Sequence, residues 1–377
     1  MNIQMVDLKG QYQKIKEEVD ARVQGVIESA AFINGPEVKR FEAELAQYLN
    51  VKHVIPCANG TDALQVALMA LGLKPGDEVI TTTFTFIATA EVIALLGLKP
   101  VLVDCEEDTF LISTEAIENA ITENTKAIIP VHLFGQCSNM EEILHIAKKH
   151  DLKIVEDSAQ SIGASFHFKD GTSMQSGTIG DFGCTSFFPS KNLGCYGDGG
   201  AIFTNDDGLA EKARVIVNHG MKVRYYHDEI GVNSRLDSIQ AAVLSVKLNY
   251  LDQYNNNRRS AASYYDEAFK GLCQISIPTR SSHSSHVFHQ YTLKVNGIDR
   301  NDLQQHMMQH DVPAMIYYPV PLHLQKAYKD ERYKDGDFPI AEKLSDCVIS
   351  LPMHSELNEN QLKYITETFI KYLNKKR

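Results

Sequence analysis

The sequence predicts an α/β protein with a mainly parallel central sheet that carries helices on both faces. The first observation is an alternation of short apolar runs with longer amphipathic segments between residues 53 and 156, which is typical of parallel strands joined by helices. The second is a change of pattern beyond about residue 250, where short pieces indicate a smaller α+β region. We therefore expect a large α/β domain over residues 1–250 and a small domain over residues 251–377.

The composition is that of an ordinary globular protein. The chain has 377 residues, of which 44% are hydrophobic and 23% are charged, and its net charge is −11 at pH 7. This acidic balance argues against a nucleic-acid partner and against binding to an anionic membrane surface. No apolar run reaches membrane-spanning length, and no signal peptide begins the chain. The seven cysteines include no CxxC pair, so the sequence predicts a protein of the reducing cytoplasm.

Two amphipathic helices are expected before the alternating region. The first covers residues 11–30, and we expect it to pack on the small domain. The second begins at residues 34–37, where Pro36 occupies an early helical position and Glu37 lies in the first turn. It is expected to end near Asn50.

The alternating region predicts strands and helices that follow one another in strict order. The expected strands are His53–Cys57, Glu78–Thr82, Val101–Asp104, Ala127–Val131 and Lys153–Glu156. The expected helices are Thr61–Leu71, Ile87–Leu96, Thr114–Ile121 and Met140–His150. Because right-handed crossovers place the carboxyl ends of parallel strands at one edge, we expect ligands to bind at that edge.

Beyond residue 157 the expected elements become shorter and then more helical. Two strand-like runs and a helix follow, over Cys184–Phe188, Ala201–Thr204 and Leu209–Asn218. Residues 237–270 predict one long helix, or two in series, opening at Asp237; a long helix would carry the chain across the domain boundary. The small domain should contain strands over 274–277 and 288–295, helices over 301–310 and 358–374, and a proline-rich loop from Tyr317 to His323.

A lysine lies in a glycine-bounded turn between the two strand-like runs. The first run ends at Pro189, Lys191 follows, and several glycines lie within residues 194–200. Such a turn can hold the amine partly desolvated, which lowers its pKa and makes it a nucleophile toward carbonyl groups. Taken alone, the stretch favours the plainer alternative, a solvated loop lysine.

Three other stretches at predicted strand ends change that interpretation. Gly60 and Thr61 open a helix directly after a strand, where free N–H groups can bind a phosphate, although Gly-Thr is also a common helix cap. Phe86 follows the next strand and could stack on a planar ring or pack in the core. Asp157 and Gln160 end a buried strand, where the acid could bind a metal or pair with a protonated ring nitrogen. No nearby ligand cluster supports a metal.

Together these stretches match the needs of one cofactor. Pyridoxal phosphate requires an anion site, a flat contact, an acid that keeps the pyridine nitrogen protonated and a lysine for a Schiff base. The lysine, in its glycine-bounded turn, follows the acid at the strand end by 191 − 157 = 34 residues.

The chain resembles the sugar-nucleotide aminotransferases of the fold-type I pyridoxal-phosphate enzymes, often called the DegT/StrS family. The resemblance extends nearly end to end and rests on spaced motifs that agree in order. These motifs are Asp7-Leu8, Gly35-Pro36-Glu37, Cys57-Ala58-Asn59-Gly60-Thr61-Asp62, Val131-His132-Leu133-Phe134-Gly135, Phe187-Phe188-Pro189-Ser190-Lys191, residues 194–200, residues 231–236 and Tyr318-Pro319. The resemblance implies a fold-type I transferase fold and a homodimer whose active sites are shared between subunits.

The resemblance also implies a role for each matched residue. Lys191 would form the Schiff base with pyridoxal 5′-phosphate, and Asp157 would pair with the pyridinium nitrogen. Gln160 would hydrogen-bond the phenolic oxygen, and Phe86 would stack on the ring. Gly60, Thr61 and Ser186 would bind the phosphate, and Asn233 would reach the phosphate bound by the neighbouring subunit.

Transamination is the reaction that this resemblance implies. Glutamate is the amino donor in most of the family, and the freed Lys191 would act as general base and then general acid. Some relatives are dehydratases with histidine at the position of the lysine, so the presence of Lys191 favours transamination.

The motifs are most similar to those of aminotransferases that act on UDP-2-acetamido-2-deoxy-3-oxo-glucuronate and make a 3-amino sugar for surface polysaccharide, such as the O-antigen of lipopolysaccharide. A uronate carboxylate calls for a cation, and Arg235 and Arg224 are the candidates. Tyr317, Tyr318 and His323 resemble a substrate-contacting loop of the family.

Two alternatives remain open at this point. One is an aminotransferase of a 3-keto- or 4-keto-6-deoxy sugar linked to dTDP, UDP or GDP. The other is a non-catalytic regulator or nucleotide-binding protein on the same fold, which the intact Lys191, Asp157 and Gln160 argue against. The histidines in the serine-rich stretch 281–286 lack further ligands at useful spacing, so we expect an exposed loop and no metal there.

Overall fold

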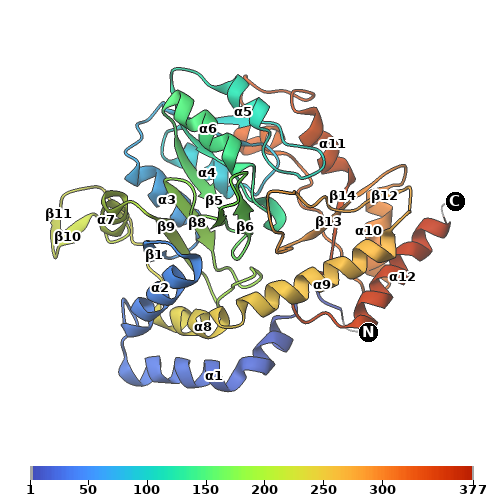
Figure 1. Ribbon diagram of the computed structural model, residues 1–377, viewed down its shortest axis with the longest axis horizontal. Helices are drawn as coiled ribbons and strands as arrows, with labels where there is room; N and C mark the ends of the chain where they lie inside the picture. Colours follow the sequence, from blue (N-terminus) through green and yellow to red (C-terminus); the bar gives the residue numbers. More distant parts are fainter. Residues whose placement is uncertain (1–2, 376–377) are drawn as a thin grey trace.

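The computed structural model describes residues 3–375 and has a central sheet with the strand order β1-β9-β8-β5-β4-β2-β3 (Figure 1). Its strands are β1 (His53–Cys57), β2 (Glu78–Thr82), β3 (Lys99–Val103), β4 (Thr125–Ile129), β5 (Lys153–Asp157), β8 (Phe182–Ser186) and β9 (Gly200–Thr204). Within this sheet, β9 alone runs against the others, because it is antiparallel to both β1 and β8. The expected mainly parallel sheet is confirmed, and the carboxyl ends of β8, β5, β4, β2 and β3 share one edge.

Helices cover both faces of this sheet, because successive strand residues point to opposite sides. The helices are α2 (Pro36–Leu49), α3 (Gly60–Ala70), α4 (Ala88–Leu95), α5 (Thr114–Ala120), α6 (Met140–His150), α7 (Asp207–Ile216) and α8 (Ser238–Leu248). Val155 packs with α3, α4 and α7 on one face, whereas its neighbour Ile154 packs with α5 and α6 on the other. Helices α2 and α8 lie on the second face, over β1 and β9.

The N-terminal helix α1 (Leu8–Ser29) contacts both parts of the molecule. Ile15 and Val19 of α1 pack with Val243 and Val246 of α8, and Figure 1 shows the two helices side by side. The first turns of α1 also reach the segment 353–356, where the side-chain amide of Gln11 donates to the Ser355 hydroxyl at 3.2 Å.

Residues beyond 250 build a second sheet and its own core. The strands β12 (Ile275–Ser276), β13 (Tyr291–Val295) and β14 (Val348–Leu351) pair antiparallel, and the helices are α9 (Leu251–Phe269), α10 (Arg300–Gln309), α11 (Pro339–Cys347) and α12 (Glu359–Lys375). Tyr265, Phe269, Tyr291 and Phe369 belong to one hydrophobic cluster of this region. Since α8 ends before α9 begins, the segment 237–270 forms two helices in series. The division of the chain into domains at residue 250 stays a prediction.

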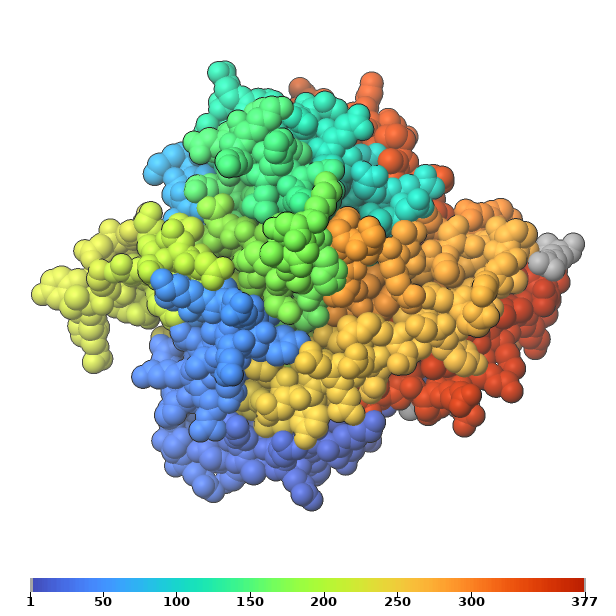
Figure 2. All heavy atoms as spheres, in the orientation of Figure 1, coloured from blue at the N-terminus to red at the C-terminus, as the bar shows by residue number. Residues whose placement is uncertain are grey.

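No bounds were predicted from the sequence for some short elements, although short β-like pieces were expected after residue 157. They are α11, β14, the hairpin of β6 (Ser165–His167) and β7 (Ser173–Gln175), the hairpin of β10 (Met221–Val223) and β11 (Tyr226–His227), and the 3₁₀ turns η1 (Leu133–Gly135), η2 (Leu322–Leu324) and η3 (Lys326–Tyr328). Residues 221–230, which we call the arm, project from the body beside α7 (Figures 1 and 2). On the arm, Val223, Tyr225, Tyr226 and Ile230 are 60%, 75%, 69% and 88% exposed. Exposed apolar surface of this extent is typical of an interaction site.

Two kinds of feature are missing from residues 3–375. None of the helices described there has the length and apolar character needed to cross a membrane. The same residues contain no group of three or more histidine, cysteine, aspartate or glutamate side chains arranged to hold a metal ion. The seven cysteines have free thiols.

Candidate active site

A cavity of about 820 Å³ lies at the carboxyl edge of the central sheet. Its walls are segments that follow β1, β2, β4, β5 and β8, together with segments of the C-terminal region. Parallel strands bring their ends together here, so segments far apart in the sequence share one wall. The cavity collects most of the predicted site residues, namely Gly60, Thr61, Phe86, Asp157, Gln160, Ser186, Lys191, Tyr317 and Tyr318.

Lys191 lies in the turn between β8 and β9 and lines the cavity. Its backbone N–H donates to the carbonyl of Phe188 at 2.8 Å, which tightens the turn. Gly194 leaves no room for a side chain, since a Cβ atom there would lie 2.4 Å from the carbonyl oxygen of Pro189. Although the side chain opens to the cavity, burial lowers the pKa of Lys191 to about 8, and the Asp157 carboxylate acts in the opposite direction. Part of this amine is therefore uncharged and nucleophilic near neutral pH.

Asp157 is the last residue of β5 and is 7% exposed. Its Oδ2 accepts a hydrogen bond from the Thr89 hydroxyl at 2.7 Å, and its Oδ1 accepts one from the Ala159 N–H at 3.2 Å. Its backbone N–H donates to the Pro130 carbonyl at 2.9 Å, and its carbonyl accepts from the His132 N–H at 3.0 Å. These contacts hold a carboxylate on the cavity wall, where it can pair with a cationic group.

Gln160 is held between two partners on the same wall. Its Oε1 accepts from the Phe134 N–H at 2.8 Å, and its Nε2 donates to the Tyr318 hydroxyl at 3.1 Å. A ligand oxygen at Gln160 would share this amide with Tyr318. Phe86 is 55% exposed, and its ring centroid lies 6.4 Å from that of Tyr318, so its face is free to stack on a planar ring.

The start of α3 forms a corner that suits an anion. Asn59 caps the helix by accepting a hydrogen bond from the Asp62 N–H at 2.8 Å. The N–H groups of Gly60 and Thr61 then have no partner within the described residues. Gly60 lies so close to Ser186 that a Cβ atom at position 60 would be 2.7 Å from the Ser186 Cβ. Free N–H groups at the positive end of a helix, beside two hydroxyls, suit a phosphate.

The residues of the cavity fit pyridoxal phosphate. The phosphate, the ring nitrogen and the aldehyde each find a matching group in the anion corner, Asp157 and Lys191. The hydroxyl of Thr85 also lines the cavity, and it is buried without a hydrogen-bond partner in the part of the chain that the structure describes. A buried polar atom of this kind is available to a ligand.

His323 lies beside the cavity. This side chain is 3% exposed and is not among the residues, within 3–375, that line the cavity. Its Nδ1 lies 2.9 Å from the Thr83 hydroxyl, and its Nε2 lies 2.9 Å from Oε1 of Glu342. Protein groups occupy both ring nitrogens, so His323 supports the wall from behind, and its expected contact with a substrate stays a prediction.

Asn233, Arg224 and Arg235 lie outside the cavity of their own chain. Arg224 is exposed on the arm, where its guanidinium lies 4.9 Å from the ring centroid of Tyr225. Asn233 is exposed and forms an isolated β-bridge with Asn218. The expected contacts of these residues with a second subunit and with a substrate stay predictions.

The cavity also contains residues that sequence reasoning missed, including Thr85, Phe188, Asp198, His289 and Gln290. Thr85 and Phe188 adjoin predicted site residues, so extending each motif by a few positions would have found them. His289 comes from the C-terminal region just before β13. Its Nδ1 lies 3.3 Å from Oδ1 of Asn192, a contact that no local pattern could reveal.

Comparisons with known proteins show the family and the fold of this chain. Residues 13–370 match the DegT/DnrJ/EryC1/StrS aminotransferase family. A "Pleiotropic regulatory protein" of Geobacillus stearothermophilus is 48% identical over 376 residues, covering 99% of each chain. The UDP-2-acetamido-2-deoxy-3-oxo-D-glucuronate aminotransferase of Pseudomonas aeruginosa is 46% identical over 363 residues, covering 96% of this chain and 98% of the relative. The crystal structure of S. venezuelae DesV in complex with ketimine intermediate has a TM-score of 0.94 at 37% identity and covers 98% of each chain.

The expected cofactor and fold class are confirmed by the same comparisons. Solved structures with a TM-score of 0.88 to this chain include one with bound PMP and one in a PLP form. Their fold is the fold-type I arrangement that the central sheet displays. By its match over residues 13–370 and by the lysine and carboxylate that share one cavity, this chain belongs to the DegT/DnrJ/EryC1/StrS family of pyridoxal-phosphate-dependent aminotransferases.

Proposed function

We propose that this chain moves an amino group from glutamate to UDP-2-acetamido-2-deoxy-3-oxo-glucuronate and so makes a 3-amino sugar for surface polysaccharide. The observation that supports it most is the cavity in which the Lys191 amine and the Asp157 carboxylate lie together beside an anion corner. The Pseudomonas aeruginosa relative, which is 46% identical, carries the name of this activity. We place the reaction in the cytoplasm.

Proton transfer in this proposal belongs to Lys191. Bound pyridoxal phosphate supplies an electron sink for the carbon that bears the transferred amino group. The Lys191 amine would act as the general base and then as the general acid for the proton on that carbon. A pKa of about 8 suits this role, because the amine can act as base and as acid near neutral pH.

The remaining cavity residues bind and orient. Asp157 would pair with the protonated ring nitrogen and keep the ring electron-withdrawing, while Gln160 would hydrogen-bond the phenolic oxygen. Phe86 would stack on the ring face. The phosphate would bind at the anion corner formed by Gly60, Thr61 and Ser186, and Tyr317 and Tyr318, which also line the cavity, would contact the sugar nucleotide.

The proposal includes a homodimer that completes each site. Asn233 of one subunit would reach the phosphate held by the other, and Arg235 or Arg224 would pair with the uronate carboxylate through a forked guanidinium. The exposed apolar residues of the arm support such an assembly, because a second subunit would remove them from water.

A panel of keto-sugar nucleotides with glutamate tests the substrate, scored by release of 2-oxoglutarate. We expect the UDP-linked 3-oxo-glucuronate derivative to be turned over fastest. Arg235→Gln and Arg224→Gln should raise KM for the uronate, with little change for a sugar that lacks the carboxylate. Equal turnover of a 6-deoxy-3-keto sugar nucleotide by the unaltered chain would contradict the uronate preference.

The name of the Geobacillus stearothermophilus relative supports a second candidate, a regulator that keeps the fold without turnover. Borohydride reduction followed by peptide mapping separates the two. A yellow protein with the cofactor fixed at Lys191, together with turnover of a keto-sugar nucleotide, supports the enzyme. A cofactor fixed at Lys191 with no turnover of any member of the panel would support the regulator.

A further inference from the structure

Glu156 precedes Asp157 in β5 but points to the opposite face of the sheet, away from the cavity. We propose that Glu156, together with His132, is a positioning unit that sets the place and the charge environment of Asp157. This inference rests on the proposed function, because it deepens the role of Asp157 toward the cofactor ring.

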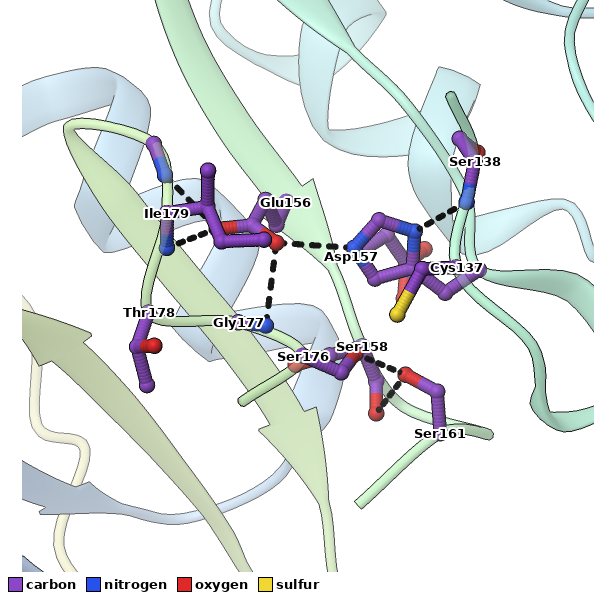
Figure 3. A network of polar contacts seen from close by, with 12 residues as sticks. Cys137, Ser138, Glu156, Asp157, Ser158, Ser161, Ser176, Gly177, Thr178 and Ile179 are labelled. Carbon is purple, nitrogen blue, oxygen red and sulfur yellow. Dashed lines mark hydrogen bonds and ion pairs between the residues drawn. The ribbon is translucent and has the colours of Figure 1, made fainter. Parts of the chain in front are cut away.

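The carboxylate of Glu156 is 0% exposed and accepts four hydrogen bonds (Figure 3). Its Oε2 accepts from the ring Nε2 of His132 at 2.8 Å and from the N–H of Gly177 at 3.0 Å. Its Oε1 accepts from the N–H groups of Ile179 and Gly180 at 2.6 and 2.7 Å. A protonated carboxyl group would place a hydrogen against one of these donors, so the geometry requires the ionised form.

The ring of His132 is held in one tautomer. Its Nδ1 accepts a hydrogen bond from the Ser138 N–H at 3.1 Å, so the proton must be on Nε2, which donates to Glu156. The imidazole is therefore neutral, and all of its partners are identified. It follows that the negative charge of Glu156 is satisfied by hydrogen bonds and is not cancelled by a cation.

Two partners of Glu156, His132 and Gly177, also lie beside the backbone at Asp157 and Ser158. The N–H of His132 donates to the Asp157 carbonyl at 3.0 Å, while its ring holds the side chain one residue earlier. On the other side, the turn at Gly177 packs under Ser158, since a Cβ atom at position 177 would lie 2.6 Å from the Ser158 hydroxyl. Three segments that are distant in the sequence thus meet around Asp157, and the bonds to Glu156 join them.

The buried charge has a second consequence. Because Glu156 has no contact with solvent, its charge is poorly screened and adds to that of Asp157. Two anions beside the end of β5 favour a protonated ring nitrogen more strongly than Asp157 would alone. Removing the charge should therefore weaken the binding of a ring that carries a protonated nitrogen, and should spare a ring that lacks the nitrogen.

The test compares two ligands on the cofactor-free protein. Dissociation constants are measured for pyridoxal 5′-phosphate and for its 1-deaza analogue, in which C–H replaces the ring nitrogen. In Glu156→Gln we expect pyridoxal phosphate to bind about tenfold more weakly. The comparison is with metal sites, where removing a residue that hydrogen-bonds a ligating side chain weakens binding by about 10- to 100-fold. Binding of the analogue should stay unchanged, because it makes no contact with Asp157 that depends on a proton.

The matched control is Glu78→Gln. Glu78 is also a buried carboxylate of the central sheet, at 5% exposure, but it begins β2 at the far edge and pairs with Lys99 at 2.7 Å. Its replacement should leave both dissociation constants unchanged. If Glu156→Gln does not fold, as judged by circular dichroism, His132→Leu decides, because it removes one of the four donors that stabilise the buried charge, and we expect the same selective loss in smaller size.

Equal weakening of both ligands in the folded variant would overturn the inference, as would no weakening of either. Neither result would touch the proposed function, which depends on turnover of a keto-sugar nucleotide by the unaltered chain. Absence of that turnover would contradict the proposed function. A selective loss in Glu156→Gln would then still describe how the cofactor site binds pyridoxal phosphate.

Discussion

Two lysines of this protein have the same lowered pKa but lie in different surroundings. Burial lowers the pKa of Lys191 and of Lys247 to about 8. Lys191 lines the cavity, where the Asp157 carboxylate opposes the shift. Lys247, on α8, is 0% exposed, donates to the carbonyl of Gly194 and lies 5.5 Å from the ring centroid of Tyr196.

The difference shows that a lowered pKa by itself marks a desolvated amine and not a reactive one. Lys247 donates to the turn that carries Lys191, because its partner Gly194 lies three residues after Lys191 in that turn. Lys191 has the cavity in front of it, so a carbonyl compound can reach its nitrogen. Access to a reacting partner therefore separates the two roles, and this comparison can be tested.

The largest expected effect separates the two lysines directly. Lys191→Ala should abolish transamination, because no other lysine among residues 3–375 lines the cavity. Lys247→Met should keep the covalent bond to pyridoxal phosphate. Borohydride reduction and peptide mapping of both variants provide the measurement. A fully active Lys191→Ala protein would show that the wrong lysine has been chosen.

Asp157→Asn should have the next largest effect. An amide in place of the carboxylate cannot keep the ring nitrogen protonated, so the ring draws electrons less strongly. We expect kcat to fall by roughly 100-fold or more, comparable to the loss of one stabilising group at a developing charge. Thr89→Val, which removes the hydroxyl bonded to Oδ2, is a graded control and should cause a smaller loss. An unchanged kcat in Asp157→Asn would contradict the role of the carboxylate.

Lys247→Met should act on stability. It leaves the buried Gly194 carbonyl without its donor, which costs about 1–3 kcal/mol, partly offset because a buried ammonium group is removed as well. Urea unfolding at pH 7 measures the difference in free energy. The absorbance of the bound cofactor reports on the turn, because that turn carries Lys191. A variant with the same stability and the same cofactor absorbance as the unaltered chain would show that the bond to Gly194 does not stabilise the turn.

The stability difference between the unaltered chain and Lys247→Met should depend on pH. The folded pKa of Lys247, about 8, lies below the ordinary value of 10.5, so the unfolded chain binds more protons between these values. The free energy of unfolding contributed by this group therefore rises as the pH increases from 8 toward 10.5. Urea titrations at pH 7.5 and 9.5 should show that the free energy of unfolding of the unaltered chain, measured relative to that of the variant, is larger at the higher pH. A difference that shrinks over this range would contradict the lowered pKa.

His323→Phe should have the smallest effect on catalysis. It removes the bonds to Thr83 and Glu342 but no group on the cavity wall, so we expect a lower melting temperature and little change in KM for the sugar nucleotide. A large rise in KM with an unchanged melting temperature would restore His323 to the substrate-contacting loop.

Local patterns were most reliable where one segment carried its own signal. The bounds of β1, β2 and α6 agree with those expected, because apolar runs with turn residues on each side describe a buried strand and amphipathic spacing describes a helix. The elements β14 and α11 were missed because they are short and lie in a stretch without clear periodicity. The expected bounds of other elements differ by a few residues at their ends, where fraying and capping decide the limit.

Some residues of the candidate site can be recognised from the local sequence, and others only from the packing of distant segments. The turn at Lys191, the strand end at Asp157 and the helix start at Gly60 are each visible in a few neighbouring residues, and parallel topology then requires them to meet. The contact of His289 with Asn192 and the position of His323 behind the wall depend on packing between distant segments. No local pattern contains that information.

By itself, the sequence determined the alternation of strands and helices, the order of the site motifs and the chemistry of the lysine and the acid, since each depends on residues close together in the chain. Tertiary structure alone decided which buried lysine opens to the cavity, which histidines pack behind the residues that line it, and which groups donate hydrogen bonds to the Glu156 carboxylate. The physical reason is that burial and hydrogen-bond partners are properties of the packed molecule, supplied by residues that the chain brings together only on folding.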